Sequence, residues 1–167
     1  AVTAAGYGSA RSVTFSEGSS ELQPWDRVRR IGKKKEITLD HVMASVAVPI
    51  IFPPVRLGDE YFGDGAMRQA TPLSPAVQLG ADRILVIGAR NEVPDPKPVP
   101  DSMIVHPNLG SIAGYVLDAL FMDGLSADLE RLTRINLLLE RVPGGGIVDG
   151  ASALRFIDVF VLSLIHI

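Results

Sequence analysis

Short apolar runs separated by turn residues open the chain. Val2–Ala5 and Ser12–Phe15 flank Gly6-Tyr7-Gly8, a pattern typical of two strands joined by a glycine-containing turn. A polar stretch then continues to Lys35, and the pattern predicts no element within it. We therefore expect the chain to begin with two neighbouring strands followed by a long loop.

Two further strand signals lie later in the chain. Val55–Leu57 and Glu60–Phe62 lie on either side of Gly58-Asp59, which predicts a hairpin with a two-residue turn. Arg83–Ala89 is almost continuously apolar and lies between turn residues, which is typical of a strand buried on both faces.

Two short helices are predicted between these strands. Asp40 can cap a helix over His41–Ala47, because an aspartate side chain accepts hydrogen bonds from the first turn. Pro72 can open a second helix that continues to about Leu79, where Gly80 ends it. Strands that alternate with helices indicate an α/β layer architecture.

The strongest helical pattern lies in the second half of the chain. An apolar stripe with helical spacing covers Leu109–Leu139 and is interrupted at Gly124. This helix could form a lid that faces lipid, although packing against the main sheet is the simpler interpretation. Four prolines make 94–100 a stiff loop or linker, Gly144-Gly145-Gly146 predicts a flexible loop, and Phe156–Leu162 predicts a last buried strand.

Composition narrows the class of protein. Hydrophobic residues make up 47% of the chain, charged residues 21%, and the mean hydropathy is +0.25, so the bulk of the chain is not disordered. The absence of cysteine excludes a disulfide framework, a thiolate zinc site and a cysteine nucleophile. A net charge of −3 and a pI near 5.6 argue against a general nucleic-acid binder.

The high apolar share indicates either a membrane protein or segments buried against something larger than this chain. No apolar run reaches the roughly 20 residues of a membrane-spanning helix, and the N-terminus lacks both a signal-peptide pattern and an initiator methionine. We expect a cytoplasmic or peripheral membrane protein that is a fragment of a larger domain. Alone, it would expose sheet edges and tend to aggregate.

The clearest candidate for chemistry is Asp64-Gly65-Ala66, directly after a predicted strand. Gly65 lets the backbone turn tightly, so that the Asp64 carboxylate would lie at the end of the strand, where α/β enzymes place reactive groups. For the tripeptide alone, a carboxylate that only caps the turn is the simpler interpretation.

The motifs around the tripeptide favour a catalytic role instead, because five of them occur in an order and spacing that is specific when taken together. They are Ala44-Ser45-Val46-Ala47-Val48-Pro49, Phe52-Pro53-Pro54, Tyr61–Ala66, Pro72-Leu73 and Leu79–Arg83, which leads into the strand. Asp40–Arg90 therefore resembles the C-terminal half of a bacterial patatin-like phospholipase domain, and the flanks resemble that group more loosely. Val46 departs from the family pattern, which usually has a small residue there.

The resemblance implies a three-layer α/β/α sheet related to that of α/β hydrolases, present here only in part. Residues 1–161, including the helical segment 109–140, would form the C-terminal portion of the domain, and 162–167 would be an atypical tail. Patatin-like enzymes hydrolyse carboxylic ester bonds of phospholipids or related lipids with a Ser–Asp dyad and without histidine, metal or cofactor. Asp64, in a DGA motif with Gly65 and Ala66, would be the general base that accepts the serine proton.

The serine partner is not found in the sequence. Near-matches to the G-x-S-x-G elbow begin at Gly18, Gly124 and Gly150, but each lacks the second glycine and the strand–turn–helix context. The glycine-rich loop that would hold the oxyanion is also missing. We expect the fragment alone to be inactive, and the alternative is a non-catalytic, patatin-derived module that binds a lipid surface or a partner.

A basic segment could provide such a lipid contact. Six basic residues fall close together: Arg27, Arg29, Arg30, Lys33, Lys34 and Lys35. They could contact an anionic membrane, although a solvated loop is the simpler interpretation. His41 and His106 are too isolated for a metal site, and no phosphate-binding loop is present.

Overall fold

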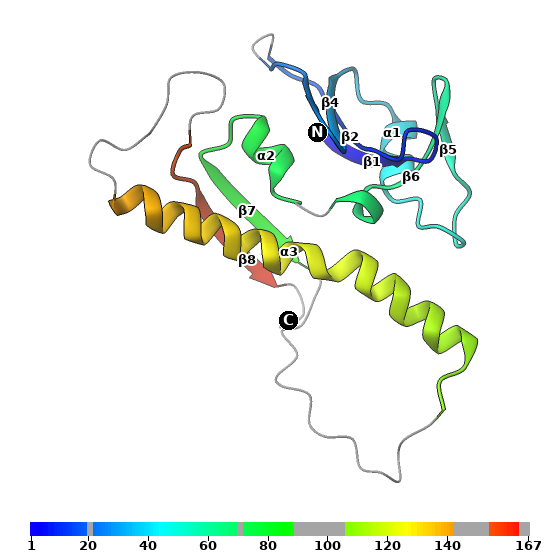
Figure 1. Cartoon of the computed structure of the whole chain (residues 1–167). Coiled ribbons are helices and arrows are strands. Elements are labelled where there is room, and N and C mark those ends of the chain that lie inside the picture. The colour runs from blue at the N-terminus through cyan, green and yellow to red at the C-terminus, as the bar shows by residue number, and fades with distance from the viewer. Residues whose placement is uncertain (20–21, 70–71, 89–105, 142–153, 164–167) are drawn as a thin grey trace.

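The computed structural model describes residues 1–19, 22–69, 72–88, 106–141 and 154–163. These residues form a mixed α/β structure with a six-stranded sheet and a separate two-stranded sheet (Figure 1). The predicted α/β class is therefore confirmed. The predicted loops at 94–100 and at Gly144-Gly145-Gly146 lie outside the described residues.

The larger sheet has the strand order β3-β4-β2-β1-β6-β5. Only β2 and β4 run parallel, and the other neighbours are antiparallel. The strands are β1 (Val2–Gly6), β2 (Ser12–Ser16), β3 (Trp25–Arg27), β4 (Arg30–Lys34), β5 (Val55–Leu57) and β6 (Glu60–Asp64). Both predicted strand pairs, β1–β2 and β5–β6, are confirmed.

The polar stretch before Lys35 is not a continuous loop, contrary to the prediction. It contains β3 and β4, which form an antiparallel hairpin in which Trp25 lies opposite Gly32. This hairpin extends the sheet because β4 pairs along its whole length with β2, from Ser12 with Arg30 to Ser16 with Lys34. Pairing with a distant strand, rather than local apolar alternation, thus makes this segment a strand.

The core of the larger sheet lies beneath α1 (Leu39–Ser45). Val13 and Phe15 of β2 pack with Ala44 of α1 and Phe62 of β6, and the two phenylalanine rings lie 5.7 Å apart at an angle of 69°. Alternation along β2 places its apolar residues on this side of the sheet. This core fixes α1 over the central strands.

The predicted cap of α1 at Asp40 is wrong. The helix is capped by Thr38, whose backbone is extended, and Asp40 lies in the first helical turn. The backbone N–H of Thr38 donates to Nδ1 of His41 at 3.1 Å, and the buried His41 ring lies edge-on to Phe15 at 4.7 Å. His41 is therefore a structural residue of the helix start.

The second sheet consists of β7 (Arg83–Gly88) and β8 (Asp158–Ser163), which are parallel. α2 (Ser74–Gln78) and α3 (Leu109–Arg141) lie beside it (Figure 1). Leu73, Ile84 and Ile157 form the buried centre between these elements. α2 begins at Ser74 rather than at Pro72, and Gly80, at φ +92°, lies just after its end, as predicted.

β7 is not buried on both faces, contrary to the prediction. Ile84 is buried, but Leu85 and Ile87 are 63% and 58% exposed. Their partners in the register are Phe160 and Leu162 of β8, which are also exposed. The helices cover one face of this sheet, so the opposite apolar face meets solvent. β8 includes Leu162 and Ser163, the first two residues of the segment expected to be an atypical tail, and 164–167 lie outside the described residues.

α3 divides its apolar stripe between two environments. Leu125, Leu129 and Leu132 pack against the second core, whereas Leu109 and Ile112 are exposed. Packing against a sheet is thus confirmed only for the C-terminal part of the stripe. Among the described residues, no helix is long and apolar enough to cross a membrane.

Candidate active site

Asp64 is held at the end of β6 by backbone contacts on two sides. It pairs with Ala4 of β1, and its N–H donates to the carbonyl of Ala47, 2.9 Å away, just after α1. The structure therefore places Asp64 at a strand end, as the sequence predicts. The side chain lies where β1, β6 and the end of α1 meet.

The Asp64 side chain also caps a short 3₁₀ helix, η1 (Gly65–Arg68). Its Oδ1 accepts a hydrogen bond from the N–H of Ala66 at 2.9 Å. The interpretation that Asp64 caps the turn is thus correct. The bond engages one of two carboxylate oxygens, so capping is compatible with a second role for the same group.

Gly65 is required by the close approach of η1 to β1. A Cβ at this position would lie 2.3 Å from the carbonyl oxygen of Thr3, and backbone at that distance cannot move aside without shifting β1. The second residue of the DGA motif therefore brings the Asp64 turn into contact with the neighbouring strand.

An open pocket of about 440 Å³ lies at this junction. Asp64, Gly65 and Ala66 form one side, and the end of α1 contributes Ser45 and apolar Val46. The arrangement places a carboxylate, a serine and apolar side chains around one solvent-accessible hollow. This combination suits a substrate that has both a polar reacting group and an apolar part.

Burial raises the pKa of Asp64 above its ordinary value of 3.8, and the hydrogen bond from Ala66 partly opposes this effect. Of the ion pairs among the described residues, none involves Asp64. A carboxylate with a raised pKa binds a proton more readily than an ordinary aspartate. Asp64 is therefore better suited to act as a base than the sequence alone indicates.

None of the near-elbow serines that the structure describes lies in an elbow. Ser126 lies inside α3 rather than at a turn between a strand and a helix. Ser20, the serine of the near-match that begins at Gly18, is outside the described residues. Ser152 is outside the described residues. Sequence reasoning overlooked Ser45, which shares the pocket with Asp64; the signal was its place in the motif Ala44–Pro49.

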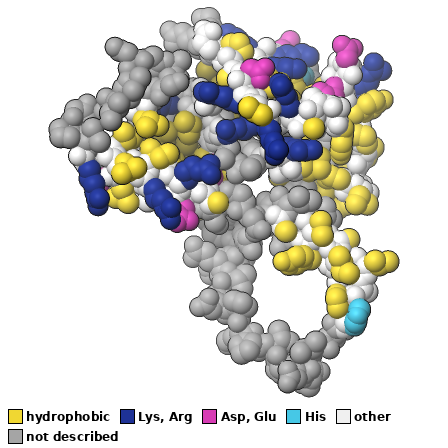
Figure 2. Space-filling view, viewed as in Figure 1, with side chains coloured by type: hydrophobic (Ala, Val, Ile, Leu, Met, Phe, Trp, Pro, Cys, Tyr) yellow, Lys and Arg dark blue, Asp and Glu magenta, His cyan; other side chains and the backbone are white. Residues whose placement is uncertain are grey.

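The basic segment lies on the β3–β4 hairpin, and Lys and Arg side chains gather on the face shown in Figure 2 around β4. Lys33 and Lys34 are consecutive strand residues and point to opposite sides of the sheet. Lys34 donates to the carbonyl of Ser19 at 2.9 Å. The six basic residues therefore do not all belong to one surface.

The two histidines that the structure describes do not form a second candidate site. His41 is buried in α1, and His106 precedes α3 next to Pro107, as predicted. Within the part of the chain that the structure describes, no three histidine, aspartate or glutamate side chains gather in a way that could hold a metal ion.

Comparison with known families gives one match. Residues 10–77 match the family model described as Patatin-like phospholipase. No curated protein and no solved structure matches the chain. The matched region runs from just before β2 into α2 and includes Asp64, Gly65 and Ala66. It begins well before Asp40 and ends before Leu79–Arg83, so it differs at both ends from the stretch that carries the sequence resemblance.

Proposed function

Because residues 10–77 match the patatin-like phospholipase family model, we propose that this chain is part of a lipid acyl hydrolase in which Asp64 is the catalytic base. The substrates are carboxylic esters of phospholipids or related lipids. The observation that carries the proposal is the position of Asp64, at the end of β6 in a partly apolar, open pocket and with a raised pKa.

The proposed reaction is a two-step acyl transfer. Asp64 accepts the proton of a serine hydroxyl as the serine oxygen attacks the ester carbonyl, and it returns that proton to the departing alcohol. Water then attacks the acyl-serine, with Asp64 accepting its proton and passing it to the serine oxygen as the fatty acid leaves. The serine and the oxyanion loop come from a part of the domain outside this chain.

A chimera tests the role of Asp64 directly. Residues 10–77 replace the corresponding segment of an active patatin-like phospholipase, and hydrolysis of a chromogenic ester and of phospholipid vesicles is measured. We expect the chimera to retain activity and Asp64→Asn to lower kcat by at least about 100-fold, as expected for loss of a general base.

Asp59→Asn is the matched control, because Asp59 lies in the exposed turn of the same β5–β6 hairpin. It should leave kcat unchanged. Equal loss of activity in both variants, or full activity of a folded Asp64→Asn chimera, would refute the assignment of Asp64.

The chain by itself should neither hydrolyse esters nor react with a fluorophosphonate probe for activated serines. Covalent labelling would contradict the proposal that the nucleophile lies elsewhere. Ser45 is the first residue to check by mass spectrometry, because it lines the same pocket as Asp64.

The second candidate function is a non-catalytic module that contacts anionic lipid through the β3–β4 hairpin. Its support is the group of Arg27, Arg29, Arg30, Lys33, Lys34 and Lys35 on and beside that hairpin. Sedimentation with vesicles that contain phosphatidylserine, compared with neutral vesicles, tests it. Binding to anionic vesicles that disappears in Lys33→Gln/Lys35→Gln would favour this function, and equal sedimentation with both vesicle types would exclude it.

A further inference from the structure

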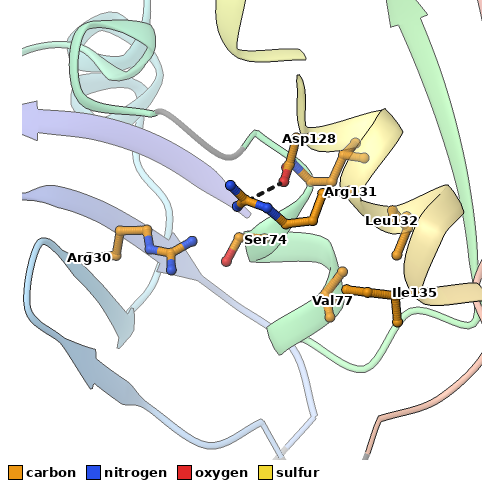
Figure 3. A pocket seen from close by; sticks show the side chains of 8 residues that line it. Arg30, Ser74, Val77, Asp128, Arg131, Leu132 and Ile135 are labelled. Carbon is orange, nitrogen blue, oxygen red and sulfur yellow. Dashed lines mark hydrogen bonds and ion pairs between the residues drawn. The ribbon is translucent and has the colours of Figure 1, made fainter. Parts of the chain in front are cut away.

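A second pocket, of about 210 Å³, lies between β4, α2 and α3 and reflects the packing of these elements (Figure 3). Asp128 of α3 is buried, and its Oδ2 accepts a hydrogen bond from the N–H of Leu73 at 2.9 Å. Its Oδ1 lies 4.0 Å from Nη1 of Arg131. These contacts hold the start of α2 against α3, so the groups that make them are already used within the fold.

The link between α1 and β5 presents apolar side chains to solvent. Every residue from 46 to 55 is apolar. Ile50 is 93% exposed, and Ile51 and Phe52 are also exposed. Figure 1 shows this link at the outer edge of the larger sheet, away from β7 and β8, and Figure 2 shows hydrophobic side chains gathered along the same edge. Adjacent apolar side chains exposed in this way are typical of an interaction site.

A hydrogen bond and prolines fix the turn at Pro49–Phe52, which we call the apolar turn. The N–H of Phe52 donates to the carbonyl of Val48 at 2.9 Å and closes the turn. Pro49 lies in it and Pro53 follows it, and the ring of each proline sets its own φ. The apolar turn is therefore ordered before any partner binds, which lowers the entropy lost on binding.

Ile50 has a backbone conformation that isoleucine rarely adopts. Its φ is +73°, in the left-handed region, which is unfavourable for a β-branched residue and readily adopted by glycine. Because its side chain is almost fully exposed, packing within the chain does not compensate for this strain. Residues strained in this way gather at functional sites. The strain is therefore best explained by a contact outside the chain.

The apolar turn lies next to the Asp64 pocket. The carbonyl of Ala47 accepts the N–H of Asp64 at 2.9 Å, and exposed Val46 lines the pocket. Val48 alone separates Ala47 from the turn. A surface that binds the apolar turn is thus held beside the pocket.

A lipid surface suits the apolar turn better than a second protein does. Three side chains offer well under the roughly 800 Å² that each partner buries in a standard protein interface. Hydrocarbon needs no matching shape and stabilises each apolar side chain that leaves water. The choice of lipid rests on the proposed function, because lipid esters lie in such surfaces, whereas the exposure and strain of Ile50 do not depend on it.

We propose that the apolar turn inserts Ile50, Ile51 and Phe52 into the hydrocarbon of a lipid surface and docks the protein with the Asp64 pocket beside the lipid. The turn carries no charged side chain, so this contact does not require anionic lipid. The contact considered above for the β3–β4 hairpin does require it. Neutral lipid therefore distinguishes the two.

Sedimentation of the full chain with neutral phosphatidylcholine vesicles tests the proposal. The parent chain should sediment with the vesicles, and Ile50→Gly should bind about tenfold more weakly, since one isoleucine no longer leaves water. The Tm of Ile50→Gly should not fall, because glycine adopts φ +73° without strain. Weaker binding then cannot be attributed to loss of the fold.

Val28→Ser is the matched control, because Val28 is an exposed apolar residue in the β3–β4 turn. It should bind the vesicles as the parent chain does. No sedimentation of the parent chain, unchanged binding of Ile50→Gly, or equal loss in both variants would overturn the proposal. Self-association that Ile50→Gly abolishes, without vesicle binding by the parent, would assign the turn to a second copy and overturn it as well.

The absence of cysteine allows a direct test of insertion. Ile51→Cys labelled with the fluorophore NBD should brighten and emit at shorter wavelength when phosphatidylcholine vesicles are added, and labelled Val28→Cys should not change. An unchanged spectrum at position 51, or equal changes at both positions, would contradict insertion of the turn. No hydrolysis is measured, so failure of the Asp64 chimera leaves these outcomes unaffected, and absence of vesicle binding leaves the assignment of Asp64 intact.

Discussion

At the scale of single residues, two opposing effects act on the pKa of Asp64. Burial disfavours its charged form, while the N–H of Ala66 stabilises that form. Because burial dominates, the pKa of Asp64 is higher in the folded chain than in the unfolded chain. The folded protein therefore holds a proton at pH values where the unfolded chain has already lost it.

This shift determines how Asp64 changes stability with pH. Its contribution to the stability of the fold is largest below the unfolded pKa of about 3.8 and is lost as pH rises through the higher folded pKa. Asp64→Asn keeps an oxygen that accepts from Ala66 but carries no charge. We expect its Tm at pH 7 to exceed that of the parent chain by about 1–2 °C, with the difference vanishing near pH 3.5.

Thermal melting followed by circular dichroism at a series of pH values measures this difference. Asp59→Asn, in the exposed turn of the same hairpin, should show no such trend. A Tm difference for Asp64→Asn that grows as pH falls would be incompatible with a raised pKa.

Gly65 is the second residue whose substitution has a defined effect. Gly65→Ala places a methyl group against the carbonyl oxygen of Thr3 and should lower the free energy of unfolding by about 1–3 kcal/mol, the range for overpacking. Urea denaturation measures this loss. Gly88→Ala is the control, because no described atom lies within 4 Å of its added Cβ. If both variants lose the same free energy of unfolding, contact with β1 is not the reason that position 65 requires glycine.

At the scale of elements, local signals predicted some strands and failed for others. The β5–β6 hairpin was predictable because Gly58, at φ +66°, forms its turn between two short alternating strands. The β3–β4 hairpin was not, because its residues are mostly polar and its strand structure depends on pairing with β2. Local sequence patterns indicate turns and apolar faces, but they do not indicate a strand that forms by pairing with a strand distant in the sequence.

For the candidate site as well, the local sequence predicted some features, whereas others depend on contacts between distant elements. The place of Asp64 at a strand end follows from the short run Glu60–Ala66, so the sequence alone predicted it. The contact of Gly65 with Thr3 and the shared pocket with Ser45 depend on how β1 and α1 pack onto β6. No local pattern contains that information.

The β3–β4 hairpin gives a prediction of its own, because the chain's single tryptophan lies on it. A Cβ on Gly32 would lie 2.2 Å from the Trp25 ring, so Gly32→Ala must displace the indole. We expect tryptophan emission to move toward longer wavelength as Trp25 becomes more exposed. Gly114→Ala, where nothing described lies within 4 Å, is the control and should leave the emission unchanged. An unshifted spectrum for Gly32→Ala would contradict the packing of Trp25 on β4.

At the scale of the whole molecule, the two sheets have two hydrophobic cores of different completeness. The core under α1 is closed around Val13, Phe15 and Phe62. The second core covers one face of β7–β8 and leaves Leu85 and Phe160 exposed on the other. An exposed apolar sheet face promotes association.

Leu85→Lys tests whether that face causes association. We expect the variant to lower the association constant by at least about tenfold in analytical ultracentrifugation, since burial of one leucine contributes about 1.5–3 kcal/mol. Val28→Lys is the control, because Val28 is equally apolar, 89% exposed and located in the β3–β4 turn. A monomeric parent chain, or equal effects of both substitutions, would exclude the β7–β8 face as the cause.

The parallel pairing of β7 with β8 also affects the order in which the chain folds. Hairpins such as β5–β6 close a two-residue loop, whereas α3 and the segments on either side of it separate β7 from β8 in the sequence. Closing a long loop costs more conformational entropy and slows the formation of the contacts it allows. We therefore expect the Asp64 hairpin to form before β7 pairs with β8.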